Sequence, residues 1–498
     1  MPFADFHVHG NFKSFFTALE VAKKKSPWDH IKVGVDKLLG NRHDRIFESQ
    51  SCFTQILNGD LQIAVMPLYS LEFAFADSFK LKFVDVTTNV IAKGFFKGIR
   101  EGSITYYQQL LDSYAHLERA KTDNALKSNI VNFTKRYSDL KPGHINIILS
   151  MEGAHCFLED ADEPVTPSGM KAIETRIMQY KSKAADNPFP RVFIINLTHL
   201  SQAPFSNHAF GIKFLPHEEF APNAKGLSPA GLRLIDVLMS HDEGHYPILI
   251  DVKHMSLESR KEYYEIRRAK FPKLPIVASH IACTGISYTK VNDYITEIRT
   301  PLLNKRRCNL ISYEKPRGIV PNTEFNPWSI NMYDEDIVQI LQSGGILGIS
   351  LDQRVLGVGK LAREKMSRGE TFRGIIPIMP YYAEDPDEEP EIHDAQLHFR
   401  HLCNNIFHIA HIALKTLGPE EQWTRIVIGS DFDGLIDAVD FCTNAEQYKN
   451  IEDYLRRYLV DIAKEARIQL PKEVDALIQG FMYENGRAFL EKYYVDDY

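Results

Sequence analysis

Eight short apolar runs, rich in Val and Ile and separated by helix-like stretches, constrain this 498-residue chain more than any other feature of its sequence. Such alternation is typical of βαβ units with parallel strands. A doubly wound open sheet produces similar runs, but His, Asp and Glu gather at their C-terminal ends, which favours a closed barrel. We therefore predict a single (β/α)8 TIM-type barrel domain over residues 1–498. The expected strands are Phe3–Phe6, Gln62–Met66, Ile145–Leu149, Val192–Asn196, Pro247–Asp251, Pro275–Ala278, Gly345–Ile349 and Arg425–Gly429.

Two segments are longer than the loops that usually join strands and helices in such a barrel. They cover about residues 284–330 and 353–394. The first carries Arg306, Arg307 and Arg317, and the second ends in an acidic stretch broken by proline. We predict that both are insertions at the C-terminal face of the barrel, and that the acidic stretch is a solvated loop.

Composition excludes several classes of protein. The chain has 44% hydrophobic and 25% charged residues and a net charge of −7 without a basic patch, which argues against disorder and against nucleic-acid binding. We find neither an apolar run long enough for a transmembrane helix nor a secretory signal. The 6 cysteines form no Cys-x-x-Cys pair, which favours a reducing compartment. A cytoplasmic location is the expectation, and a homodimer is left open.

Candidate metal ligands follow the first predicted strand. His7 and His9 are two residues apart, so on an extended strand they point to the same side and can bind one metal ion. By itself, a pair of histidines at a strand end is a weak signal, because such pairs often only form hydrogen bonds.

The other strand ends strengthen this signal, because the C-terminal ends of parallel barrel strands meet on one face. Glu152 follows the third predicted strand, His254 and His280 follow the fifth and sixth, and Asp431 follows the eighth. Zinc favours this mixture of imidazole and carboxylate, and a bridging carboxylate allows two ions to lie about 3.5–4 Å apart. The sequence therefore predicts a site for two divalent metal ions, with zinc as the metal.

In order and in spacing, these motifs resemble the membrane (renal) dipeptidase family of the amidohydrolase superfamily. The resemblance runs from Phe3 to the helix that contains Asn485-Gly486-Arg487. The segments that match best are Ile195–His199 with Asn207 downstream, Gly226–Gly231, Asp251–His254, Pro275–His280 and, most specifically, Ile428–Gly434.

The resemblance implies an activity and a role for each matching residue. It makes His7 a ligand of the first metal, Glu152 the bridge between the two ions, and His254 and His280 ligands of the second metal. His199 would contact the carbonyl oxygen of the scissile bond, which makes it both catalytic and substrate-binding. Asp431 would shuttle the proton. The implied function is hydrolysis of a dipeptide or a similar small amide by metal-activated water.

The chain departs from the family pattern in two places. The family usually has Asp where His9 stands, a change that keeps a metal ligand but alters its charge. The family's arginine for the substrate carboxylate has no clear counterpart, because Ile330-Asn331 occupies the matching stretch. Arginine binds carboxylates through two parallel hydrogen bonds, so Arg306, Arg307 or Arg317 could replace it. We favour Arg317, because Pro316 and Gly318 indicate a shaped turn.

Two alternative functions remain open at this stage. The chain could hydrolyse an N-acyl amino acid, a cyclic amide or an ester, or it could be a non-catalytic metal-binding homologue. Two further groups of polar residues are interpreted as structural. These are the histidines His398, His401, His408 and His411 on one predicted helix, and Asp433 beside Asp431.

Overall fold

The computed structural model describes residues 1–16, 25–31, 46, 48–78, 94–124, 126–212, 217–223, 226–300, 308–359, 361, 363–367, 378–380 and 394–496. Its main sheet follows the order β1-β2-β4-β5-β6-β7-β10-β13, with every neighbouring pair parallel. These strands are β1 (Phe3–Asp5), β2 (Leu61–Leu68), β4 (Ile145–Glu152), β5 (Val192–Asn196), β6 (Leu249–Asp251), β7 (Val277–Ile281), β10 (Ile346–Ile349) and β13 (Ile426–Ile428). Each of the eight overlaps a predicted strand.

The first and last strands come together, which decides between a barrel and an open sheet. The backbone N–H of Phe6 donates to the carbonyl of Ile428 at 2.9 Å, and that of Asp431 donates to the carbonyl of His7, also at 2.9 Å. The predicted (β/α)8 barrel is therefore confirmed. Nearly every residue of these strands is buried, because side chains fill the barrel inside and helices cover it outside. The short strand β3 (Val131–Phe133), which we did not predict, pairs with β4.

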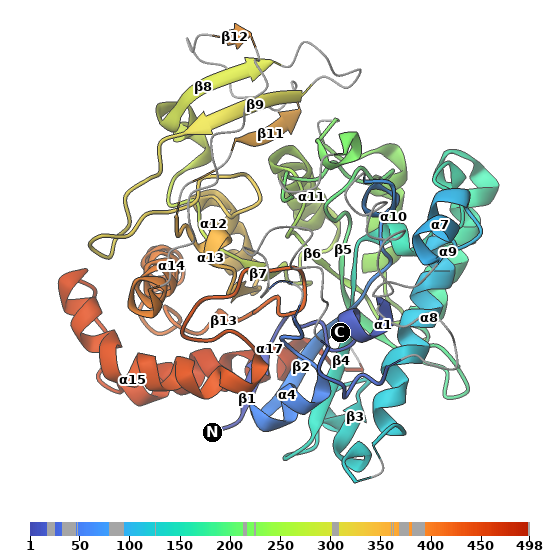
Figure 1. Ribbon diagram of the computed structural model, residues 1–498, viewed down its shortest axis with the longest axis horizontal. Helices are drawn as coiled ribbons and strands as arrows, with labels where there is room; N and C mark the ends of the chain where they lie inside the picture. The colour runs from blue at the N-terminus through green and yellow to red at the C-terminus, as the bar shows by residue number, and fades with distance from the viewer. Residues whose placement is uncertain are drawn as a thin grey trace.

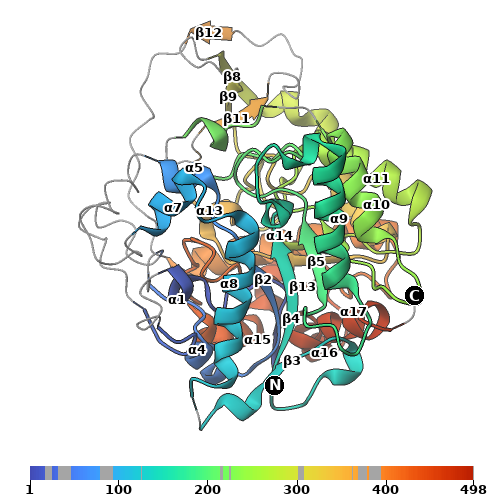
Figure 2. The same ribbon diagram turned by 90° about the vertical axis from the view of Figure 1, so that its right-hand side faces the viewer.

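Helices surround the barrel in both views (Figures 1 and 2). They are α1 (Phe12–Phe16), α4 (Phe53–Asn58), α5 (Phe73–Asp77), α7 (Phe95–Glu101), α8 (Tyr106–Glu118), α9 (Pro167–Lys181), α10 (Pro229–Met239), α11 (Leu257–Lys270), α12 (Asp334–Gln342), α13 (Gln353–Leu356), α14 (Ala395–Thr416), α15 (Tyr448–Glu465), α16 (Val474–Gln479) and α17 (Asn485–Tyr493), with a π-helical turn at Gly480–Glu484. None of these described helices combines the length and the apolarity needed to cross a membrane.

Local sequence fixes where the crossover helices begin. Ser228 caps α10 by accepting a hydrogen bond from the N–H of Gly231, and Pro229 occupies the first turn, where its missing N–H has no cost. A side chain at Gly231 would lie 1.9 Å from the carbonyl oxygen of Phe205, so only glycine fits there. Ser256 caps α11 in the same way through the N–H of Ser259. The cap at Ser256 makes α11 begin directly after β6 and the functional residues that follow this strand.

The two predicted insertions follow the C-terminal ends of β7 and β10, as expected, and they pair with each other. The first provides β8 (Ile295–Thr300) and β9 (Cys308–Tyr313), and the second provides β11 (Glu364–Ser367) and β12 (Ile378–Pro380). Together they form a second sheet in the order β11-β9-β8-β12, which lies outside the barrel in both views (Figures 1 and 2). We had predicted no strands in these segments. Arg306, Arg307 and most of the acidic stretch lie outside the described residues.

Candidate metal centre

Glu152, the last residue of β4, lies between two pairs of histidines. On one side, its Oε1 is 3.3 Å from His7 Nε2 and its Oε2 is 3.3 Å from His9 Nε2. On the other side, its Oε1 is 3.4 Å from His254 Nε2 and 3.7 Å from His280 Nε2. The structure therefore brings all five predicted metal ligands together, with one carboxylate shared between two groups of donors.

The histidine nitrogens face each other as well as the carboxylates. The Nε2 atoms of His7 and His9 are 3.3 Å apart, and those of His254 and His280 are 2.9 Å apart. Two nitrogens that bind one tetrahedral zinc ion at about 2.0–2.1 Å also lie about 3.3 Å apart. Buried imidazole nitrogens arranged in this way fit a shared cation, because only one nitrogen of such a pair can donate to the other.

The pKa values of these groups favour the forms that bind a cation. Burial lowers the pKa of His254 to about 3 and that of His280 well below its usual value, so both rings are neutral and have a lone pair to offer. Burial alone would raise the pKa of Glu152, but the neighbouring histidines His199, His7 and His9 hold it well below the usual range. Metals bind the deprotonated forms of both residue types.

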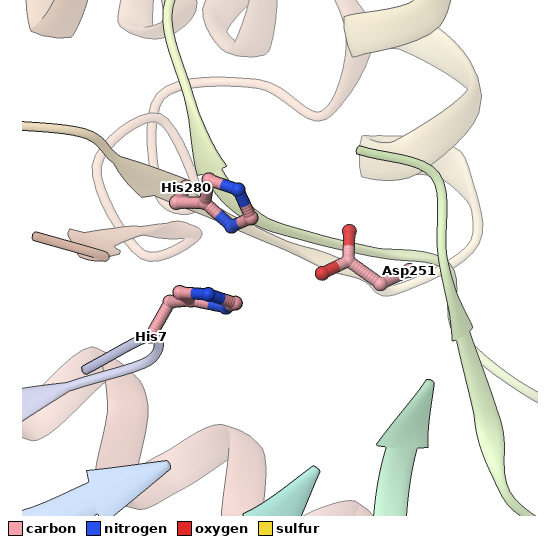
Figure 3. Close-up of side chains that lie close together, drawn as sticks. All are labelled: His7, Asp251 and His280. Atoms are coloured by element: carbon pink, nitrogen blue, oxygen red, sulfur yellow. The ribbon is translucent and has the colours of Figure 1, made fainter. Parts of the chain in front are cut away.

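Asp251 belongs to this cluster, although sequence reasoning had given it no role. Its carboxylate and the rings of His7 and His280 point toward one another from the ends of β6, β1 and β7 (Figure 3), and together they form a third group of potential ligands. Asp251 Oδ1 accepts hydrogen bonds from the backbone N–H groups of Lys253 and Ser279, whereas the buried Oδ2 has no partner. Such an orphaned oxygen fits a site that takes a cation.

Ser279 orients two of the rings from behind. Its Oγ is 3.1 Å from Nδ1 of His7 and 2.8 Å from Nδ1 of His280. Hydrogen bonds at the rear nitrogen fix the tautomer and direct the other nitrogen toward a metal. Ser279 therefore supports both groups of donors.

His199 lies at the edge of the cluster and is held by Glu72. Its Nδ1 is 2.7 Å from Glu72 Oε1, and its Nε2 is 3.5 Å from Glu152 Oε1. Burial disfavours a charged His199, but Glu152 and Glu72 outweigh it and raise the pKa of His199 to about 9. Burial likewise opposes ionisation of Glu72, yet the charge of His199 lowers the pKa of Glu72 to about 2. The pair is therefore ionised on both sides. Tyr69 adds a hydrogen bond to Glu72.

Asp431 closes the barrel through its backbone and reaches the cluster through its side chain. Its Oδ1 lies 3.5 Å from His9 Nε2 and 3.8 Å from His7 Nε2, and the side chain keeps 16% of its exposure. Its backbone adopts φ +64°, a left-handed conformation that Asp tolerates better than most residues. A side chain at Gly434 would lie 2.0 Å from this Oδ1, so glycine leaves room for the carboxylate. Burial raises the pKa of Asp431, which suits a group that exchanges protons.

The charge of Asp431 acts on two cations that sequence reasoning missed. Lys253 follows β6 and is 2% exposed, and burial lowers its pKa to about 8. Arg354 lies in α13, and its Nε and Nη2 donate to the carboxylate of Asp352. The charge of Asp431 acts on both cations. The candidate site therefore has positive side chains beside its proton-exchanging carboxylate.

Arg317 lies elsewhere. It is exposed and pairs through its backbone with Glu324, in a turn that docks on α14 through a hydrogen bond from Ile319 N–H to Asn404 Oδ1. Among the described residues, no hydrogen bond or ion pair joins Arg317 to the histidine cluster. Its predicted role in substrate binding stays a prediction.

The residues interpreted as structural make structural contacts. Asp433 accepts hydrogen bonds from Lys13 Nζ and from the backbone N–H groups of Gln50 and Ser51. On α14, His408 Nε2 is 2.8 Å from Asp334 Oδ1, and His398 is buried against the backbone N–H of Asp440. None of these described residues belongs to a group of potential metal ligands.

Comparison with known proteins supports the fold. No protein-family model matches the chain, and neither does any curated protein. Among solved structures, a metallo peptidase from Rhodobacter sphaeroides, crystallised with a phosphinate mimic of the dipeptide L-Ala-D-Ala, is 12% identical and aligns over 99% of both chains with a TM-score of 0.50. The dipeptidase AC is 12% identical over 90% of both chains, with a TM-score of 0.47. The probable dipeptidase PvdM from Pseudomonas aeruginosa is 16% identical over 89% of this chain and 88% of its own, with a TM-score of 0.47.

Proposed function

We propose that this chain is a metal-dependent hydrolase that cleaves a dipeptide or a similar small amide, with two zinc ions as its cofactor. The observation that carries the proposal is the position of Glu152, whose carboxylate lies within 3.3–3.7 Å of the Nε2 atoms of two pairs of histidines, His7 with His9 and His254 with His280. The full-length likeness in fold to a metallo peptidase that was crystallised with a dipeptide mimic adds support.

The donors divide into two sets around Glu152. His7 and His9 would hold one ion, His254 and His280 would hold the other, and Glu152 would serve both. When bound, divalent ions polarise a carbonyl group and lower the pKa of water from about 15.7 toward 7, so that hydroxide is available at neutral pH. Asp251, with its unpartnered Oδ2, forms a third group of potential ligands with His7 and His280, so it would be available to either ion.

Asp431 is the proposed proton carrier. It is the most exposed carboxylate among the cluster residues, and its Oδ1 contacts the His7 and His9 rings. Attack of water on an amide requires that one proton leave the water and that the departing amine receive one. A carboxylate with a raised pKa can perform both transfers.

His199 is the proposed donor to the carbonyl oxygen of the substrate. Glu72 accepts from Nδ1, which directs Nε2 toward the centre, where it lies 3.5 Å from Glu152 Oε1. The raised pKa keeps this ring protonated, so it offers a charged N–H as negative charge develops on the oxygen. Loss of such a donor typically costs about 2.7–4 kcal/mol of transition-state stabilisation.

Metal analysis combined with a substrate panel tests the proposal. We expect close to two zinc ions per chain, and hydrolysis that a chelator abolishes and zinc restores. The panel contains dipeptides, N-acyl amino acids, cyclic amides and esters, so that it separates the dipeptidase function from its alternatives. Protein that holds zinc but hydrolyses no member would support the non-catalytic alternative. Protein that binds no metal would overturn the assignment of the site.

A further inference from the structure

One buried cation in the barrel lacks a partner. Among the described residues, three lysines are buried: Lys13, Lys181 and Lys253. Lys13 pairs with Asp433 at 2.6 Å, and Lys181 donates to the carbonyl of Ser240 at 2.8 Å. Lys253 Nζ, by contrast, has neither a hydrogen-bond acceptor nor a carboxylate within 4.0 Å in the described part of the chain. Because an unpaired buried ammonium group is costly, its position calls for a partner that the chain itself does not supply.

The position of Lys253 is fixed by its backbone. Its N–H donates to Asp251 Oδ1 at 3.0 Å, and its carbonyl accepts from Asn196 Nδ2 at 3.1 Å. Its Nζ retains contact with solvent, unlike enclosed atoms such as Asp251 Oδ2. An incoming ligand can therefore reach this ammonium group.

The surroundings of Lys253 place its charge next to the reacting groups. The charges of Asp431, Asp352 and Glu152 act on it, and its own charge acts on His254 and His280. The ammonium group thus lies near the candidate metal ligands and near Asp431 without touching either.

Arg354 is a second cation, and only part of its guanidinium group is hydrogen-bonded. Its Nε is 2.9 Å from Asp352 Oδ1, and its Nη2 is 2.6 Å from Asp352 Oδ2 and 3.1 Å from the carbonyl of Leu435. Its Nη1 has no acceptor among the described residues, and the side chain is 33% exposed. Asp352 therefore fixes one edge of the guanidinium group and leaves Nη1 for another partner. Because the charge of Asp352 also acts on Lys253, the two cations are close to the same carboxylate.

We propose that Lys253, assisted by Arg354, binds a carboxylate of the substrate. This inference rests on the proposed function and specifies its substrate class. Both cations are near Asp431, which is the group proposed to protonate the departing amine. The carboxylate therefore belongs to the amine half of the amide, as in a dipeptide or an N-acyl amino acid, and an amide without an anionic group on that half is a poor substrate.

Binding of a simple carboxylate to the zinc-loaded protein tests the inference. The probes are 4-methylpentanoate and the matched neutral 4-methylpentan-1-ol, measured by calorimetry at pH 7. Their isobutyl group suits the apolar side chains beside the site, since Phe12 contacts His9 with ring centroids 5.6 Å apart and Leu435 packs in the same cluster.

We expect Lys253→Met to weaken carboxylate binding about 10- to 100-fold, the range for a lost hydrogen bond to a charged group. Binding of the alcohol and the zinc content should stay unchanged, and Lys253→Arg should restore carboxylate affinity. Lys261→Met is the matched control, because Lys261 is 42% exposed on α11 and pairs with Glu258. Carboxylate binding within about twofold of wild type in Lys253→Met, or an equal loss for both probes, overturns the inference.

Two further measurements keep the inference falsifiable. If Lys253→Met does not fold, Arg354→Gln must weaken binding of the carboxylate but not of the alcohol. An affinity of Arg354→Gln for the carboxylate equal to that of the wild type contradicts the inference. Hydrolysis of Ala-Leu and of Ala-Leu-amide separates the two proposals. Failure to hydrolyse either peptide while the wild type binds the carboxylate through Lys253 refutes only the proposed function. Hydrolysis of both with the same KM refutes only the role of Lys253.

Discussion

The barrel mouth and the contact between α11 and α12 both bury charged side chains, but they satisfy those charges in different ways. Between the helices, Arg260 donates from Nε to Asp336 Oδ1 at 3.1 Å, and its Nη1 donates to the carbonyl of Ser329 at 2.7 Å. Tyr264 completes the pair through a hydrogen bond to Asp336. At the mouth, histidine nitrogens face each other at 2.9 and 3.3 Å, and Asp251 Oδ2 has no partner.

This difference separates charges that stabilise the fold from charges that serve a ligand. Complementary donors and acceptors surround the Arg260–Asp336 pair, so the folded chain alone satisfies it. At the mouth, the facing histidine nitrogens and Asp251 Oδ2 lack such complements, so their burial costs stability until a cation binds. We therefore expect that changes at the pair alter stability without altering metal content, and that changes at the mouth alter metal binding or turnover.

The largest expected effect is on stability. Arg260→Met leaves Asp336 buried without its cation, and loss of one partner from a buried ion pair typically costs about 3–5 kcal/mol. Denaturant unfolding of the zinc-loaded protein measures this cost, and zinc per folded chain should stay at the wild-type level. The double variant Arg260→Met, Asp336→Leu should recover most of the stability, because it removes both charges. A loss of zinc in the single variant would show that the two regions are not independent.

Glu152→Gln should have the largest effect at the mouth. Even residues that only support metal ligands typically change affinity about 10- to 100-fold, so loss of the shared carboxylate should weaken zinc binding more than about 100-fold, or about 2.7 kcal/mol. Competition with a chelator of known affinity measures the change. Glu174→Gln, at an exposed pair with Arg233, is the control. Wild-type zinc affinity in Glu152→Gln would place the metal elsewhere.

Asp431→Asn should affect turnover rather than metal binding. Asn tolerates the left-handed backbone at φ +64°, so the fold is preserved, but an amide cannot carry the proton. We expect kcat to fall about 100-fold, within the usual range for a lost general acid–base group, while the zinc content is unchanged. Assays with the best substrate of the panel measure kcat and KM separately. Turnover near the wild-type rate would exclude Asp431 as the proton carrier.

The same comparison explains what the sequence could predict. Barrel strands such as Val192–Asn196 are largely apolar runs, because both of their faces are buried, and their polar ends are visible in the sequence. His7, His9 and His254 follow such strands, and Glu152 and His280 lie at their C-terminal ends, which is why their convergence could be inferred from the order of the strands. In these strands, the apolar pattern of the sequence and the positions of the polar residues lead to the same prediction.

Other parts of the molecule carry no comparable signal. Glu72 lies four residues beyond the end of β2 between Leu71 and Phe73, where a single charged residue gives no indication that it pairs with His199. The second sheet forms by pairing β8 with β12 from the other insertion, and no local pattern predicts a partner so distant in the sequence. Lys253 stands inside a recognised motif, yet only the structure reveals that its ammonium group lacks a partner.

The smallest expected effect concerns Glu72, which acts on the reaction through His199. Glu72→Gln keeps a hydrogen-bond acceptor for Nδ1 but removes the charge that favours a protonated ring. We expect kcat to fall about 10-fold, the lower range for residues that orient a functional side chain, with zinc content unchanged.

Stability of the metal-free protein against pH provides a second measure of the same pair. The pKa of His199 is about 9 in the folded chain and about 6.5 when unfolded, so the folded state holds an extra proton between these values. Its contribution to stability is fully present below about pH 6.5 and disappears as the pH rises through about 9. In Glu72→Gln this decline should be shallower but still present, because Glu152 also raises the pKa of His199. An identical decline in both proteins would mean that Glu72 does not control the protonation of His199.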